Sequence, residues 1–150
     1  MSAKKQTKSS DNFEPIKKLI LDNRISHKEI ADLSNIDYPL FSFRHLRLNS
    51  IKKCADPQFF ISFLTQLRDL SNIGWASIRQ SGRHDYGMEP IPRNQIKADL
   101  SSLSDIITPE VRKLDVFRAD KDNHVFVGRQ VGKVFHVFFI EAKFGDIYDH

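Results

Sequence analysis

The sequence predicts an α+β fold in which a small antiparallel β-sheet of about four strands carries helices on one face. Three short apolar runs lie in the last third of the chain, at residues 114–118, 124–129 and 134–140, with tight polar connections between them. Because short connections that contain Gly or Asp join neighbouring antiparallel strands, these runs indicate a three-stranded meander. Residues 57–70 repeat apolar side chains at helical spacing, as a helix that covers a sheet does.

The first 39 residues are expected to lie outside this sheet. Residues 1–12 are polar and contain three lysines, which predicts a disordered basic tail. Residues 13–39 are expected to form an N-terminal helical extension, since their apolar side chains follow helical spacing and Ser26 forms a capping box with Glu29. The two helices resemble a helix-turn-helix, but the strand pattern that begins at Leu40 leaves little room for a complete DNA-recognition unit.

A strand and two helices are expected before the meander. Residues 40–46 alternate like a strand. Asp56 and Pro57 then give the N-cap and first-turn signal of a helix that runs to about Leu70, and a shorter helix is expected at residues 73–79.

A long connection leads from these helices to the meander. Residues 88–92 are bounded by Gly87 and contain two prolines, which fits extended structure, whereas the polar and Ser-rich residues 94–107 predict no regular element. Residues 40–150 together are expected to form one α+β domain. Its helices would cover one face of the sheet and leave the other face partly free for a substrate.

Composition narrows the classes of function. A hydrophobic fraction of 40%, with twelve Phe, is enough for one core in 150 residues. The net charge of +4 favours an anionic partner such as a nucleic acid. The chain has neither a signal-peptide pattern nor an apolar run of about 18 residues, so we expect a cytoplasmic protein that does not enter a membrane.

No cofactor and no metal are expected. The chain lacks a Gly-rich phosphate loop and a His-Glu-x-x-His motif, which argues against nucleotide hydrolysis and zinc proteolysis. The one cysteine, Cys54, cannot form an internal disulfide and has no Cys or His nearby at metal-ligand spacing. The carboxylates of Glu141, Asp146 and Asp149 are expected to be solvated charges.

Residues that could cleave RNA without a metal gather on or beside the predicted sheet. Such cleavage needs a base for the 2′-hydroxyl, an acid for the departing 5′-oxygen, and cations for the charge that develops on phosphorus. The candidates are Arg118, Arg129, His136, Tyr148 and His150. Each also has a structural interpretation, in which His136 makes one structural hydrogen bond and the arginines at strand ends are solvated.

The faces of the strands decide which candidates can meet. Period-two alternation puts His136, Phe138 and Ile140 on one side of the last strand and Phe135, Val137 and Phe139 on the other. It likewise separates His124 and Phe126 from Val125, Val127 and Arg129. Whether His136 and Arg129 share a face depends on a strand register that the sequence leaves open. Additional RNA contacts are expected from Arg83, His84, Lys133 and Lys143.

These residues suggest a family. The order strand, helix, helix and three-stranded meander, with Arg129 after Val-Phe-Val-Gly and the apolar pattern of residues 133–139, resembles the RelE/ParE-like toxins of bacterial toxin–antitoxin systems. The resemblance covers about residues 40–150 and implies a RelE-like fold, metal-independent cleavage of mRNA, often on the ribosome, and an antitoxin partner that covers the active surface. The residue types that match at comparable places are Arg118, Arg129, His136 and Tyr148.

We therefore expect a toxin-like, metal-independent endoribonuclease. In this hypothesis His136 or His150 serves as base or acid, while Arg118 and Arg129 hold the scissile phosphate. Two alternatives remain open from the sequence: a non-catalytic module that binds RNA or protein, and a gyrase-directed ParE-like toxin. Turnover of RNA distinguishes the first hypothesis from both.

Overall fold

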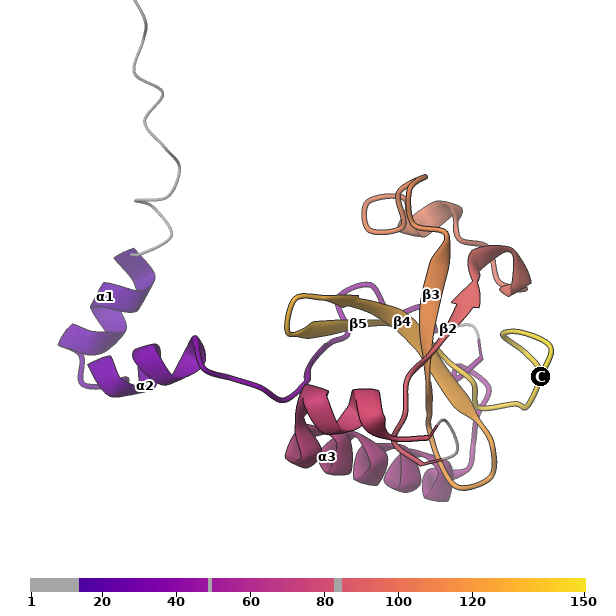
Figure 1. Ribbon diagram of the computed structural model, residues 1–150, viewed down its shortest axis with the longest axis horizontal. Coiled ribbons are helices and arrows are strands. Elements are labelled where there is room, and N and C mark those ends of the chain that lie inside the picture. The colour runs from indigo at the N-terminus through magenta and orange to yellow at the C-terminus, as the bar shows by residue number, and fades with distance from the viewer. Residues whose placement is uncertain (1–13, 49, 83–84) are drawn as a thin grey trace, which may run out of the picture. The chain divides into compact units, whose positions relative to one another are not determined.

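The computed structural model describes residues 14–48, 50–82 and 85–150, which divide into two compact units, residues Met1–Ile36 and Asp37–His150 (Figure 1). The predicted tail at residues 1–12 lies outside the described residues, as do Phe13, Arg83 and His84.

The first unit contains two short helices, α1 (Glu14–Leu21) and α2 (His27–Leu33). The predicted capping box is confirmed: the Glu29 backbone N–H donates to Ser26 Oγ at 3.1 Å, and the Ser26 N–H donates to Glu29 Oε2 at 2.6 Å. These bonds satisfy amide groups that the first turn of α2 would otherwise leave unpaired. Neither helix buries a side chain.

The second unit is built on a five-stranded sheet in the order β1-β5-β4-β3-β2. Its strands are β1 (Leu40–Ser42), β2 (Glu89–Pro92), β3 (Lys113–Arg118), β4 (Val125–Val131) and β5 (Val134–Ile140). The α+β class and the meander of β3, β4 and β5 are confirmed.

The sheet is mixed and has five strands, so the predicted antiparallel sheet of about four strands is confirmed only in part. Strand β1 pairs with β5 in parallel, and β2 adds a fifth strand. The alternation of side chains is the same in parallel and antiparallel strands, and strand direction depends on the path of the whole intervening chain. Strand β1 is also shorter than predicted, because the chain turns after Ser42.

One long helical element, α3 (Pro57–Gln80), spans both helices predicted after β1. Its start is as predicted, with Pro57 in the first turn and the Asp56 carboxylate accepting from the Gln58 N–H at 3.0 Å. A kink at Gly74, whose φ is 77°, divides the element. This conformation favours glycine, and it lets the Trp75 N–H bond the Asp37 carbonyl oxygen at 2.8 Å.

The helix α3 covers one face of the sheet, as Figure 1 shows. Buried aromatic rings dominate this core, and the rings of Phe117 and Phe135 lie 4.9 Å apart in an edge-to-face arrangement. The buried members from α3 and the sheet are Phe59, Phe63, Leu67, Leu70, Trp75, Ile78, Phe117, Ala119, Phe126, Phe135, Val137 and Ile140.

The centre of the opposite face is also covered. The expectation that this face is partly free is therefore wrong for its centre. The chain between β2 and β3 packs there with two short 3₁₀ helices, η1 (Arg93–Gln95) and η2 (Ser101–Leu103), as does the segment after β5. Leu103, Ile107 and Ile147 are buried against the sheet. The Ser-rich composition of residues 94–107 concealed these apolar anchors, which have no regular spacing.

A β-bulge changes the faces of the last strand. The pairing jumps from Val127 with Phe139 to Gly128 with Val137, which leaves Phe138 as an extra residue. The predicted alternation is correct up to Phe138 and wrong for Phe139 and Ile140. Ile140 belongs to the α3 core and Phe139 to the opposite one.

Among the described residues, no helix combines the length and the apolar character needed to cross a bilayer.

Candidate active site

The register of β4 and β5 brings two predicted site residues together. Arg129 and His136 are direct cross-strand partners, so their side chains lie on the same face of the sheet. The ring of a third residue, His45, lies with its centroid 5.8 Å from that of His136. We refer to His45, Arg129 and His136 as the imidazole–arginine centre.

A tight turn places His45 in this centre. The Leu46 N–H donates to the Phe43 carbonyl at 3.1 Å, and the Arg44 N–H donates to Ser42 Oγ at 3.4 Å. Because Ser42 is the parallel partner of His136, the turn begins beside that histidine. It leaves Phe43 44% exposed and Arg44 exposed.

The sequence reasoning missed His45 and Arg44 because residues 40–46 were assigned entirely to a strand. The overlooked signal was the run of an aromatic, a cation and an imidazole at the end of an apolar segment. Such interleaving is typical of surfaces that contact nucleic acid.

His136 favours its neutral form. Burial lowers its pKa below the usual value for histidine, and the electrostatic interactions with His45 and Arg129 lower it further. Its Nδ1 atom is buried and has no hydrogen-bond partner among the described residues. A neutral imidazole that carries its hydrogen on the buried Nδ1 keeps a lone pair on Nε2, and that nitrogen can accept a proton from a substrate hydroxyl.

Arg129 is held in place by the covering segment. Its Nη1 donates to the Ile106 carbonyl at 2.8 Å, which uses one of the five guanidinium N–H groups. Arg47 bonds the same segment through Nη2 and the Ser102 carbonyl, also at 2.8 Å. The bond to Ile106 fixes Arg129 beside His136 and leaves further N–H groups of its guanidinium that can reach a phosphate oxygen.

Arg118 lies away from this centre, contrary to the idea that one phosphate is held by both arginines. Arg118 pairs with Val125, four residues before Arg129 on β4, which is a separation of about 13 Å at about 3.3 Å per residue. Its Nη1 donates to Asn123 Oδ1 at 2.9 Å across the turn between β3 and β4.

Tyr148 and His150 form a second group beyond the end of β5. The ring of His150 stacks on Phe144 at 4.1 Å and lies 4.5 Å from the ring of Tyr148. Its Nε2 lies 2.9 Å from Glu141 Oε1. We call His150, Glu141, Phe144 and Tyr148 the C-terminal clamp; Tyr148 also lines one small hollow with Arg118.

Glu141 is fully buried, so the expectation that it is solvated is wrong. Burial raises its pKa, and the interaction with His150 opposes that rise. The Gly145 N–H donates to Oε2 at 3.2 Å. Across the described ranges, no group of three or more His, Cys, Asp or Glu side chains is arranged to hold a metal ion.

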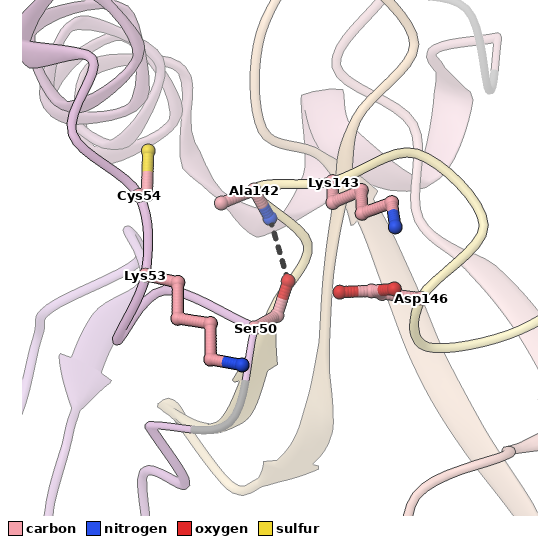
Figure 2. Close-up of a pocket in the computed structure, with 6 residues that line it drawn as sticks. All are labelled: Ser50, Lys53, Cys54, Ala142, Lys143 and Asp146. Atoms are coloured by element: carbon pink, nitrogen blue, oxygen red, sulfur yellow. Dashed lines mark hydrogen bonds between the residues drawn. The ribbon is translucent and has the colours of Figure 1, made fainter.

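The two lysines predicted to bind RNA have different surroundings. The carbonyl of Lys133 accepts from the Leu40 N–H at 3.1 Å and from Trp75 Nε1 at 3.3 Å, so this residue links β1 and α3 to the turn after β4. Lys143 lines a surface hollow of about 400 Å³ with Ser50, Lys53, Cys54, Ala142 and Asp146 (Figure 2).

Comparison of the chain with models of protein families, with curated proteins and with solved structures finds no match.

Proposed function

We propose that the protein is a toxin-like, metal-independent endoribonuclease and that the imidazole–arginine centre is its active site. The observation that carries the proposal is the cross-strand pairing of Arg129 with His136 beside the ring of His45. Two imidazoles and a guanidinium at one place can supply the base, the acid and the cation that transfer of a phosphoryl group to a ribose hydroxyl requires.

The roles follow from the electrostatics. His136, whose pKa is lowered, takes the proton of the 2′-hydroxyl. The 2′-oxygen then forms a bond to phosphorus while the bond from phosphorus to the 5′-oxygen breaks. His45 donates a proton to the departing 5′-oxygen, and Arg129 stabilises the charge on the phosphate oxygens. The products are a 2′,3′-cyclic phosphate and a 5′-hydroxyl.

The surrounding turn supports RNA as the substrate. Exposed Phe43 offers a face on which an unpaired base can stack, and exposed Arg44 offers a cation for the backbone. The proposal extends to mRNA as the substrate and to a cognate antitoxin that covers this surface, in accordance with the family resemblance of residues 40–150.

The test is cleavage of labelled single-stranded RNA in EDTA, with free RNA and with translating ribosomes. We expect fragments that end in 2′,3′-cyclic phosphate with the unaltered protein and a greatly reduced rate of their formation with His136→Ala or Arg129→Ala. His27→Ala is the matched control, because His27 is an exposed histidine of the first unit. Intact RNA in both assays would contradict the proposal and favour a non-catalytic RNA-binding module.

A further inference from the structure

The hollow around Lys143 has the chemistry of a nucleotide site. Figure 2 shows Ser50 and Lys53 on one wall and Lys143 and Asp146 on the other. The Ala142 N–H donates to Ser50 Oγ at 3.0 Å, which leaves the serine hydroxyl proton available to a ligand. A volume of about 400 Å³ lies within the range of small-ligand sites.

The hollow lies on the same sheet edge as the imidazole–arginine centre. Residues after β1 stay beside β5: the Arg47 N–H donates to the Phe138 carbonyl at 2.7 Å, and Ser50 bonds Ala142. One edge therefore runs from His136 past the end of β5 to Ala142. The two residues are less than about 20 Å apart along it, since six fully extended residues would cover that length and the strand contains a bulge.

Positively charged side chains lie along this edge, on the segment after β1 and on the segment after β5. Arg44, Lys52, Lys53 and Lys143 are all exposed. Lysine ammonium groups attract phosphate as compact point charges, and single-stranded nucleic acids are held by grooves that follow their backbone with positive charge.

Asp146 makes the hollow more selective than a phosphate site alone. Its carboxylate reduces the attraction for a bare anion, and it can accept a hydrogen bond from a ribose hydroxyl or a base amino group. Two lysines, one hydroxyl and one carboxylate together fit a nucleotide unit. The lysines and the hydroxyl can donate to its phosphate, and the carboxylate can accept from its sugar or base.

We infer that the hollow lined by Ser50, Lys53, Lys143 and Asp146 is a second subsite for the RNA strand that is cleaved at the imidazole–arginine centre. The inference rests on the proposed function in taking RNA as the ligand.

The test uses fluorescence-labelled 2′-O-methyl oligonucleotides, which lack the attacking hydroxyl and so report binding without cleavage. We expect affinity to rise when the length increases from two to eight nucleotides. In Lys53→Gln/Lys143→Gln that gain should be lost, and the slope of log affinity against log salt should fall by about 1.4, since each contact with a single strand contributes about 0.7. The matched control is Lys113→Gln/Lys121→Gln, two exposed lysines on and beside β3.

The results separate this inference from the proposed function. If the double variant loses the gain of affinity with length but the unaltered protein cleaves no RNA, the subsite is upheld and the endoribonuclease is rejected. Unchanged binding in the double variant, with cleavage intact, would overturn the subsite alone. An acidic peptide that occupies the hollow in preference to RNA would also overturn it. Asp146→Asn is expected to strengthen binding of a bare phosphate while weakening discrimination for RNA over DNA of the same length, measured with unmodified RNA, which keeps its 2′-hydroxyls, in the His136→Ala background.

Discussion

His136 and His150 lie near the two ends of β5 and have opposite surroundings. The ring of His150 stacks on Phe144, lies beside the ring of Tyr148 and is bonded to the buried carboxylate of Glu141. His136 has a buried Nδ1 atom without a partner among the described residues, and its charged neighbours are cations. Buried polar atoms in folded proteins are almost always bonded, so an exception calls for an explanation such as a bound water, an ion or a catalytic role. The comparison indicates a structural role for His150 and a chemical role for His136.

The C-terminal clamp has the properties of a structural device in other respects too. The Lys97 backbone N–H donates to the Ile147 carbonyl at 2.7 Å, and its Nζ donates to the Gly145 carbonyl at 2.9 Å. These bonds close the segment after β5 over Glu141. The imidazole–arginine centre is bounded instead by a turn whose Phe43 and Arg44 are exposed.

The largest expected effect is on catalysis by the two histidines. His136→Ala should lower kcat about 10²- to 10⁴-fold, the usual contribution of a general acid or base, while circular dichroism shows a retained fold. His150→Ala should leave kcat per folded molecule unchanged in the same EDTA assay. Equal losses in both variants would remove the distinction between the two histidines.

The second prediction concerns the backbone under His136. A Cβ at Gly128 would collide with the His136 carbonyl oxygen and approach the Phe135 ring to 2.7 Å. Gly128→Ala should therefore lower the free energy of unfolding by about 3 kcal/mol, at the upper end of overpacking effects, as measured in urea. Gly82→Ala is the control, since its Cβ would meet no atom within 4 Å. A stable Gly128→Ala variant would show that the bulge of β5 relaxes easily.

The third prediction separates stability from activity in the clamp. Removing the imidazole in His150→Ala leaves Glu141, which is fully buried, without one of its hydrogen-bond donors. The free energy of unfolding should fall by about 2 kcal/mol, the cost of an unsatisfied buried acceptor. Thermal unfolding monitored by circular dichroism measures it, and an unchanged midpoint would mean that water replaces the imidazole.

The sequence predicted the parts of this molecule that local signals determine. Asp56 and Pro57 mark the start of α3, and the strand at residues 134–140 coincides with β5. The connection at residues 88–92 was correctly expected to be extended and became β2, an edge strand that tolerates Pro90 and Pro92. Each signal involves residues close together in the chain.

The site depends on long-range geometry, and the sequence predicted only part of it. Arg129 and His136 were named as candidates, but only the register shows that they are partners. His45 joins them because β1 runs parallel to β5 and turns after Ser42, neither of which follows from alternation. Tyr148 and His150 were grouped with them only because they are close in sequence.

The smallest expected effect is a shift in the pH dependence of kcat/KM. Burial lowers the pKa of His136, and the charges of His45 and Arg129 lower it further, so the base form should persist below the usual pKa of about 6.5. The acid limb of kcat/KM against pH should lie below that value. In Arg129→Gln one of those charges is absent, so the limb should move upward by a fraction of a pH unit in addition to the loss of rate.

The same pKa shift also determines how the free energy of unfolding changes with pH. Because the pKa of His136 is lower in the folded state than in the unfolded state, the unfolded chain binds more protons between the two values. The contribution of His136 to stability is therefore present above about pH 6.5 and is lost as the pH falls through the folded-state pKa. Urea unfolding at several pH values should show this loss in the unaltered protein and a smaller one in His136→Gln, whose amide does not titrate. Two results together would contradict this account: an acid limb that does not move in Arg129→Gln, and the same pH profile of stability in the unaltered protein and in His136→Gln. They would mean that the charges around His136 do not act on it. The chemical role assigned to this histidine would then lose its electrostatic basis.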